Sequence, residues 1–476
     1  MVKTVQNTVD TPIAAYNAMA AHWELIDALL GGTLAMRAAS DTYLPRETKE
    51  DATLYNNRLN RSVLYGAYED TVEDLADRPF AKPVTIQGEL PDVLADILES
   101  VDGQGTNLTQ FARELLYAGT NAGLTHVLVD VPATRNEGDP PLTKAAEQQN
   151  GIRPIFVHIK AQDLIGWRYE IVAGKPKLVQ IRWRESREEA DGTYGTKTVE
   201  AIRVYTDIGW ELHEKNDNNV YVLIDSGTHT YPDGIPLVTL YLQKTGFMTA
   251  EPPLEKLAWL NLSHWQNNSD QMNIVHYGRT ALLFGSGFTE DEVEKDVVLG
   301  PNRIFRCTNE NAKLGYVEPA GAAMEAGRKE LEAIQEQMEV LGVQPLMRKS
   351  GTTTATGQSI DEARSQSSMQ AWVRAAERTL EGCFGVAALW LKLDLPDDFK
   401  VDIFNEFGLS LRANEDIKSL IQIRQAREIS HETFLREVRR RAVLSETLDI
   451  DEEIRRVAAE GPSLGLVGVG VGAEDD

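Results

Sequence analysis

The chain has 476 residues, a length that corresponds to roughly two to four domain-sized units. Apolar residues make up 42% and charged residues 25%, close to ordinary soluble usage, so the chain can bury a sizeable core. The 73 acidic and 48 basic residues give a net charge of −25, which argues against wrapping around phosphate backbones with a basic surface. The same charge permits a protein that surrounds DNA without gripping it, because a negative field repels the duplex.

The two cysteines, Cys307 and Cys383, have no CxxC spacing and no neighbouring histidine cluster. This spacing predicts neither a disulfide framework nor a zinc site, and it indicates folding in a reducing cytoplasm. The start of the chain lacks the basic-then-apolar pattern of a signal peptide. No apolar run approaches the ~18 residues that a membrane span needs, so we expect a soluble protein without a membrane partner.

Apolar residues at helical spacing predict three helices and one strand in the first third of the chain. The first helix covers residues 14–30 and ends at Gly31-Gly32. The second covers about 49–75 and ends before Arg78-Pro79. The third covers 107–123 and ends at Gly123. A buried strand follows at 126–131, and a polar loop runs from it to about residue 150. His22 and His126 lie on these apolar elements, and we expect both in the core.

Between Arg153 and Leu242 the sequence predicts a β-rich region, mostly antiparallel because turn clusters separate short β-branched runs. The runs are 155–159, 178–183, 201–206, 221–224 and 237–242, and the turns lie at 190–192, 215–219 and 232–234. The charged stretch 185–189 is most simply the solvated flank of a hairpin.

Pro252-Pro253 marks a boundary, after which a helix is predicted over 254–277. A compact insertion with strand-like pieces occupies 278–318, and a second helix runs from Pro319 to Leu341. The apolar positions of the second helix follow 3-4 spacing. They are Met324, Gly327, Leu331, Ile334, Met338 and Leu341. By spacing alone, these segments form a helical hairpin with a module at its tip.

The last third begins with a loop. Residues 342–357 have little periodicity and are rich in Gly, Ser and Thr, which predicts a flexible segment. Ser359 and Glu362 have the spacing of a capping box, so a long helix is expected from there to about Leu393. A strand at 399–404, helices at 414–428 and at 431–441 started by Ser430, and a disordered tail from Gly461 complete the prediction.

Short sequence words recur in a fixed order over roughly residues 20–440. They are Leu30-Gly-Gly32 with Met36-Arg37, Tyr43-Leu-Pro-Arg46, Tyr55-x-x-Arg58-Leu59, Asp102-x-x-Gly105-Thr106 with Phe111-Ala112, Leu128-Val-Asp130-x-Pro132, Tyr231-Pro-x-Gly234-x-Pro236, Pro252-Pro253-Leu254 with Leu260-Asn261-Leu262-x-His264, and Ile429-Ser430. These words follow one another in a fixed order, together with the predicted hairpin, loop and long helix. In both respects the chain resembles a divergent subgroup of the portal proteins of tailed bacteriophages.

The resemblance implies an α+β portal fold. Its expected parts are an α/β wing over 1–250 (a helical part, then a β-rich part), a stem of two helices over 251–277 and 319–343, a small α/β clip over 278–318, a tunnel loop over 344–357, a long bridging helix and wing return over 358–411, crown-like helices over 412–460 and a tail over 461–476.

The resemblance also implies a homo-oligomeric ring, usually of twelve subunits, at one capsid vertex of the virion and assembled in the host cytoplasm. Double-stranded DNA would pass through this head-to-tail connector during packaging and ejection. The expected partners are the terminase, the major capsid protein and the head-completion or adaptor proteins. The ATPase of the motor would be a separate protein.

Within this family the loop is the best candidate for a surface that faces DNA. Its candidates are Arg348, Lys349, Ser350, Thr352, Thr353 and Thr354. The two cations would touch phosphates, and the hydroxyl groups would add contacts that do not depend on sequence. Without the resemblance, a surface loop with two incidental cations is the simpler interpretation.

The stem supplies two further sets of candidates. Glu325, Glu332, Glu336 and Glu339 either line a channel and repel DNA or form a solvated helix face supported by Glu325–Lys329 and Arg328–Glu332 pairs. A closed ring also needs a head-to-tail contact between copies. Its candidates are Gln266, Asn267 and Asn268, whose amides bond without burying charge, and Leu331, Ile334 and Met338, although such stripes are usually intramolecular core.

We predict no catalytic residue, no metal site and no cofactor. The sequence has no GxxxxGK[ST] and no HExxH, and its glycine-rich tail lacks a strand–helix context. Asp130 is expected to be a turn carboxylate, and the arginines at 436 and 439–441 suit either the end of a helix or a partner site. The alternatives are another phage head or neck structural protein, or a nucleic-acid enzyme in which Asp130 would bind a metal.

Overall fold

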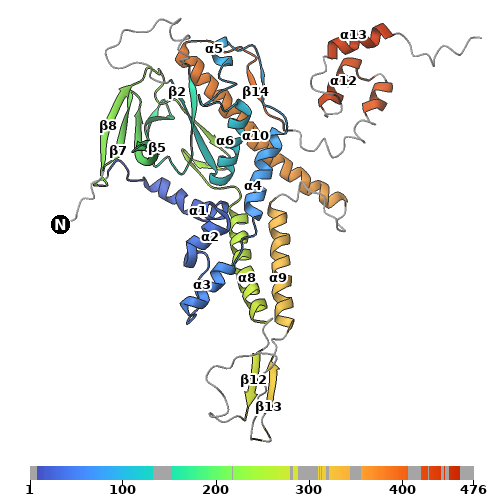
Figure 1. Cartoon of the computed structure of the whole chain (residues 1–476). Helices are drawn as coiled ribbons and strands as arrows, with labels where there is room; N and C mark the ends of the chain where they lie inside the picture. Colours follow the sequence, from blue (N-terminus) through green and yellow to red (C-terminus); the bar gives the residue numbers. More distant parts are fainter. Residues whose placement is uncertain are drawn as a thin grey trace, which may run out of the picture.

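The structure is a computed structural model of the chain. It describes residues 8–131, 153–216, 218–278, 282–287, 309, 311, 313–317, 321–342, 355–405, 420–426, 428–440, 444 and 450–460. Helices and antiparallel sheets both occur among them, which confirms the α+β class. A body of helices and sheets carries a long helical hairpin that projects from one side (Figure 1).

The helices of the first part are short and lie close together. They are α1 (Ala14–Leu30), α2 (Gly32–Ala39), η1 (Ser40–Thr42), α3 (Ala52–Arg61), α4 (Ala67–Asp77), η2 (Arg78–Phe80), α5 (Asp92–Ala95) and α6 (Leu108–Ala122). The helix predicted over 14–30 is confirmed to the residue. The one predicted over 107–123 is also confirmed: Asn107 and Gln110 form a capping box, and Gly123 ends α6 with φ of 84°.

The single helix predicted over about 49–75 is wrong. The chain leaves the helical conformation at Ser62, whose ψ is 134°, and enters α4 at Ala67. The apolar spacing continues across the break, but the Val63 and Tyr65 carbonyls accept hydrogen bonds from side chains of a distant helix, as described below.

Two antiparallel sheets make up most of the β structure. The order β3-β2-β9 joins Ile155–Ile159, Leu124–Asp130 and Leu237–Tyr241. The second sheet is a meander of β4 (Gly166–Val172), β5 (Lys175–Asp191), β6 (Gly195–Thr206), β7 (Gly209–Lys215) and β8 (Tyr221–Thr228). The predicted antiparallel character is confirmed, but β4 and β7 were not predicted. Three small pairs complete the set in the described residues: β1 (Thr85–Gln87) with β14 (Lys400–Asp402), β10 (Lys244–Gly246) with β11 (Thr249–Ala250), and β12 (Leu282–Ser286) with β13 (Lys313–Val317).

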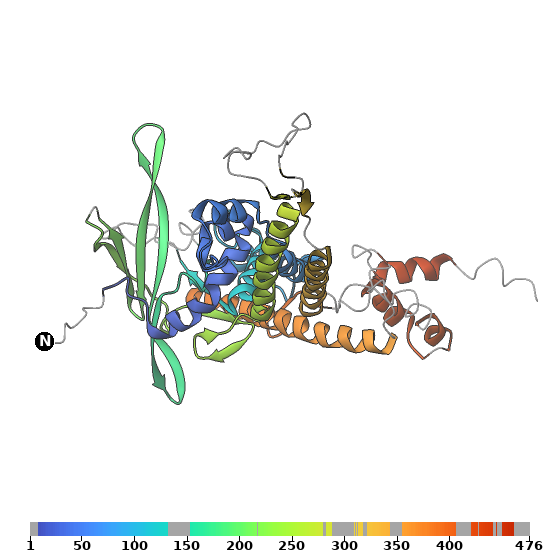
Figure 2. The ribbon, with the colours of Figure 1, turned by 90° about the horizontal axis from the view of Figure 1, so that it is seen from below.

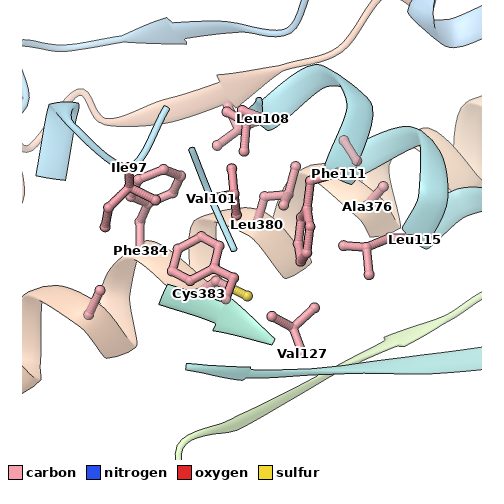
Figure 3. Close-up of a cluster of buried hydrophobic side chains, with 14 of the residues drawn as sticks. Ile97, Val101, Leu108, Phe111, Leu115, Val127, Ala376, Leu380, Cys383 and Phe384 are labelled. Carbon is pink, nitrogen blue, oxygen red and sulfur yellow. The ribbon is translucent and has the colours of Figure 1, made fainter. Parts of the chain in front are cut away.

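The longest helix is α10 (Ala355–Leu391), which packs against α6, β2, β9 and β14. We call the apolar cluster at this contact the α10 core. Figure 3 shows Phe111, Val127, Leu380, Cys383 and Phe384 pointing toward one another within it. The predicted seam of α10 is buried from Met369 to Ala387, while Trp390 is only partly covered.

The predicted start of this helix is wrong. It begins at Ala355, four residues before Ser359, so the expected capping box lies inside the helix and the helix takes in the last three residues assigned to the loop. The flanking glycine and threonine residues made a later start the natural prediction, but Ala355 is itself a strong helix former.

Two more apolar clusters lie outside the α10 core. One joins α1 to both large sheets. The other cluster, which we call the hairpin junction, contains side chains of the four helices α1, α2, α3 and α4. It also contains side chains of α8 (Glu255–Gly278) and α9 (Gly321–Leu341), and Met369 of α10. Near the end of the chain, α12 (His431–Arg440) packs against α13 (Ile450–Glu460). The predicted start at Ser430 is confirmed, because its Oγ accepts from the Thr433 amide at 3.1 Å.

Candidate functional site

The α8–α9 hairpin is the most distinctive part of the molecule. Its two helices lie side by side and point away from the body (Figure 1). At 1.5 Å per residue, their 24 and 21 residues span about 36 Å and about 32 Å. At the far end, β12 (Leu282–Ser286) pairs with β13 (Lys313–Val317) in an antiparallel ladder. The hairpin with a module at its tip is therefore present as the spacing predicted.

The predicted seam of α9 forms part of the hairpin junction. Ile334 and Met338 are buried in the same cluster as Leu262 and Trp265 of α8. Leu331 is half-buried, while Leu341 at the end of the helix is exposed. The role of Leu331, Ile334 and Met338 at a subunit interface stays a prediction, and Leu331 is the one with the most side chain left for a neighbour.

Close approach of the two helices requires a residue without a side chain. Gln271 of α8 donates from Nε2 to the Met324 carbonyl of α9 at 2.8 Å. A Cβ on Gly327 would lie 2.2 Å from Oε1 of Gln271, so this contact depends on the glycine. Nearer the body, Gln335 Nε2 donates to His264 Nε2 at 3.0 Å, and burial lowers the pKa of His264, which favours the neutral ring that accepts this bond.

Uncharged polar side chains of α8 anchor the hairpin to the break between α3 and α4. Asn261 accepts from the Tyr68 amide at 2.9 Å and donates to the Tyr65 carbonyl at 2.8 Å. Asn268 Nδ2 donates to the Val63 carbonyl at 3.2 Å, and Ser62 Oγ donates to Ser269 Oγ at 2.8 Å. These bonds satisfy backbone groups that the interrupted helix leaves free.

Of the amides predicted at a subunit interface, two make contacts between elements of their own chain. Gln266 Nε2 donates to the Tyr43 carbonyl at 3.0 Å, and Asn268 bonds to Val63 as described above. Asn267 instead donates to the Ser263 carbonyl of its own helix at 2.9 Å. All three are half-buried, and their role between copies stays a prediction.

A buried ion pair strengthens the same junction. Arg58 of α3 is 5% exposed, and its Nε and Nη2 both lie 3.0 Å from the Glu50 carboxylate. Nη2 also donates to the Pro45 carbonyl at 3.1 Å, and Nη1 lies 3.4 Å from Asp270 of α8. The hydrogen bonds from Arg58 lower the pKa of Glu50. The two-pronged contact ties α3 to the segment that precedes it, and the contact with Asp270 links α3 to α8.

The outer face of α9 is acidic. Glu325, Glu332, Glu336 and Glu339 are all exposed on it. Arg328 lies 2.7 Å from Glu325 and 2.5 Å from Glu332, and Lys329 lies 3.8 Å from Glu325, so the predicted pairs along the helix are confirmed. The proximity of Arg328 lowers the pKa of Glu325. Whether this face lines a channel stays a prediction.

The residues predicted to face DNA (Arg348, Lys349, Ser350, Thr352, Thr353 and Thr354) lie outside the described residues, as does the predicted tail 461–476. The described chain stops at Gly342, directly after α9, and resumes at Ala355, the first residue of α10.

Among the described residues, no group of three or more His, Cys, Asp or Glu side chains is arranged to hold a metal ion. Asp130 lies at the end of β2, its Oδ1 accepts from the Val131 amide at 2.9 Å, and burial raises its pKa, as befits a turn carboxylate. Burial likewise raises the pKa of the Cys383 thiol. None of the helices in the described ranges is both long and apolar enough to cross a membrane.

The two histidines predicted in the core differ. His126 is buried, and its Nδ1 lies 3.0 Å from Thr239 Oγ1. His22 is wrongly predicted, because its side chain is 38% exposed and donates from Nδ1 to Glu255 Oε1 at 2.7 Å. This bond links α1 to the first turn of α8, and no local sequence pattern predicts it, since the partners are 233 residues apart.

The comparisons with known proteins cover the chain unevenly. A family described as a domain of unknown function (DUF4055) matches residues 253–391, which run from the start of α8 to the end of α10. No curated protein matches the sequence.

Solved structures align over a longer stretch. The virion of a native gene transfer agent particle aligns with a TM-score of 0.43 and 11% identity, over 83% of this chain and 96% of that chain. The neck of an empty particle of this kind, computed with C6 symmetry, gives 0.44 and 10%, over 77% and 88%. The neck of the native particle, computed with C12 symmetry, gives 0.41 and 11%, over 77% and 88%.

Proposed function

We propose that the chain is the portal subunit of a tailed bacteriophage or a related particle. The observation that carries the proposal is one continuous arrangement: a projecting hairpin of α8 and α9 with β12 and β13 at its tip, followed by the 37-residue α10, which returns into the core of the body. Such a rod on a broad base suits a ring in which the hairpins of neighbouring copies surround a hole and the bodies form a flange.

The charge of the hairpin suits a passage for DNA. The outer face of α9 presents four glutamates, at 325, 332, 336 and 339, against Arg328 and Lys329. Toward a hole, such a face would repel the duplex and let it slide, while the segment with Arg348 and Lys349 would touch phosphates transiently. The mechanism is passive in this account: the chain guides DNA, and a separate ATPase moves it.

The finer parts of the proposal concern assembly and partners. Twelve copies would form the ring at one capsid vertex of the virion after assembly in the host cytoplasm. The tip with β12 and β13 is the natural docking place for the terminase and later for head-completion proteins, because it lies farthest from the body (Figure 1). The body would contact the major capsid protein. No catalytic role is assigned to the chain.

The proposal is tested by the mass and symmetry of the purified protein. Native mass spectrometry at increasing protein concentration gives the number of copies, and negative-stain class averages show whether the assembly has a hole. We expect rings of about twelve copies with a central hole. A stable monomer or dimer that hydrolyses nucleotide or DNA would overturn the proposal and favour the nucleic-acid enzyme.

A further inference from the structure

The long β5–β6 ribbon extends past the five-stranded sheet at one end. The β4 ladder on β5 ends at Arg182, and the β7 ladder on β6 begins at Ala201. Beyond these points, residues 186–191 and 195–200 pair only with each other. We call residues 186–200 the acidic end. A two-stranded ribbon is marginally stable in water without something to pack against.

The acidic end is exposed and negatively charged. It contains four acidic residues, at 188, 189, 191 and 200, and two basic residues, at 187 and 197. Part of this charge is used locally, because Arg187 and Lys197 pair with Glu189, and Glu200 pairs with Lys215. At its turn, Tyr194 is 100% exposed. An aromatic ring on the tip of a charged arm is costly to leave in water and suited to insertion into a partner.

The β4–β5 hairpin, at the opposite end of β5, has the opposite charge. Residues 168–177, which we call the basic end, contain three basic residues (168, 175 and 177) and one acidic residue (170). Lys177 lies 3.1 Å from Asp233, which leaves Arg168 and Lys175 as the cations at the tip. The apolar side chains there are Tyr169, Ile171 and Val172, which are 47%, 64% and 51% exposed.

Figure 2 shows the two ends projecting in opposite directions past the body. A closed ring of identical copies requires a head-to-tail contact, in which one surface of a copy meets a different surface of the next. Two unlike surfaces on opposite sides of one subunit, with opposite charge, meet this requirement without any change of shape.

We infer that the acidic end of one copy docks on the basic end of the next copy. This inference rests on the proposed ring and identifies one of its contacts. Tyr194 packs on Tyr169 and Ile171, which share one face of β4, while Glu188 and Asp191 lie near Arg168 and Lys175 of the neighbour. Burial of the apolar side chains supplies affinity, and the charges fix the partner and the register.

Charge reversal tests the contact. One variant carries Glu188→Lys with Asp191→Lys, a second carries Arg168→Glu with Lys175→Glu, and a third carries all four changes. We expect each double variant to weaken the contact between neighbours about tenfold, because attraction becomes repulsion at two exposed pairs. The fourfold variant restores the attraction with reversed polarity, so its rings should match the wild type within about threefold. The readout is the fraction of ring by native mass spectrometry against protein and salt concentration.

A matched control is Glu211→Lys with Asp225→Lys. It changes the net charge as the first variant does, but on β7 and β8 of the same sheet, and should leave ring assembly unchanged. Tyr194→Ser, which changes no charge, should also weaken the rings. Urea midpoints of all variants equal to the wild type would show that the body is folded.

The outcomes separate the two proposals. If the wild type forms rings and both double variants form them equally well, this contact is wrong and the proposed function stands. Failure of the fourfold variant to recover, or equal weakening by the control, also overturns the contact. A wild-type chain that never forms rings removes the proposed function and the contact together.

Discussion

The α10 core and the hairpin junction are both buried, but different interactions hold them. The α10 core is almost entirely apolar, with Phe384 between Phe156 and Phe399 at ring distances of 5.3 Å and 5.5 Å. The hairpin junction has apolar side chains around Trp265 as well, but it also buries Arg58 and Asn261 with their hydrogen bonds. Apolar burial has no direction, whereas hydrogen bonds do.

The difference corresponds to what each region must do. A core that holds sheets and helices together tolerates several packings of similar volume. A hairpin that projects from a body must leave it at one angle, and polar contacts to a fixed backbone define that angle. We therefore expect substitutions in the α10 core to cost the most stability and substitutions in the junction to loosen the hairpin selectively.

The largest effect is expected for Phe384→Ala. It leaves a cavity in a rigid apolar cluster and should lower the free energy of unfolding by about 3–5 kcal/mol. Urea denaturation followed by tryptophan fluorescence measures it. Leu389→Ala, on an exposed position of the same helix, should cost less than about 1 kcal/mol. Equal costs for the two variants would show that this cluster does not stabilise the fold.

Acid should weaken the sheet beside the α10 core before it affects the junction. Burial lowers the pKa of His126 to about 3 and that of His158 to about 4, from an ordinary value of 6.5. Below pH 6.5 the unfolded chain therefore binds protons that the folded chain does not, and stability falls as the pH drops toward 4. Together, the two histidines should lower the free energy of unfolding by about 3–4 kcal/mol when the pH falls from 7 to 5.

The lowered pKa of Glu50 predicts a different pH dependence for the hairpin junction. Arg58 lowers the pKa of Glu50, so that pair stabilises the fold above the ordinary carboxylate pKa and loses its contribution only as the pH falls through the lowered value. Hydrogen exchange at pH 7 and pH 5 should show opening in β2 and β3 and not in α3. Replacing both histidines with glutamine should remove most of this pH dependence, and an unchanged dependence would contradict the assignment.

In the hairpin junction, Arg58→Met should cost about 2–3 kcal/mol, because it leaves the buried Glu50 carboxylate without its partner. Hydrogen exchange in α3 should rise more than in α10. The control is Arg61→Met, which removes only a bond to Asn273 of 2.8 Å and should cost less than about 1 kcal/mol. A rise in hydrogen exchange confined to α10 would show that Arg58 does not anchor α3.

Asn261→Ala tests the polar contact at the break between α3 and α4. The buried Tyr68 amide and the Tyr65 carbonyl both lose their partner, so we expect a cost of about 2 kcal/mol. Asn267→Ala removes bonds to Ser263 within one helix and should change stability by less than about 0.5 kcal/mol. A similar cost for both would mean that the break is held by other contacts.

The smallest effect is expected on the outer face of α9. Glu325→Gln with Glu332→Gln breaks exposed pairs with Arg328 and should leave the midpoint of thermal unfolding almost unchanged, because water screens these charges. Circular dichroism of thermal unfolding measures it. A clear shift of the midpoint would show that the face packs against another part of the assembly.

The sequence predicted the elements whose signals are local. The helix over 14–30, the capping box of α6 and the strand 155–159 depend on neighbouring residues, and all are confirmed. The break between α3 and α4 was missed because its partners, Asn261 and Asn268, lie about 200 residues away in the sequence. β4 and β7 were missed because charged residues interrupt their apolar pattern.

In the candidate site, too, local sequence patterns predict some features and not others. The apolar seam and the ion pairs of α9 follow from helical spacing, and the structure contains them. The contacts of Arg58, Gln266 and Asn268 with distant backbone carbonyls have no local signature. The surfaces that would meet DNA or a second copy depend on molecules beyond this chain, so spacing within the chain does not specify them.

We propose that the α8–α9 hairpins of several copies surround a hole. Electron cryomicroscopy of the purified assembly tests it most directly. The account predicts a closed ring with the hairpins side by side around the hole, the outer face of α9 toward the hole, and β12 and β13 at one end. A hole lined by the five-stranded sheet, or an assembly with the hairpins at its outer edge, would contradict it.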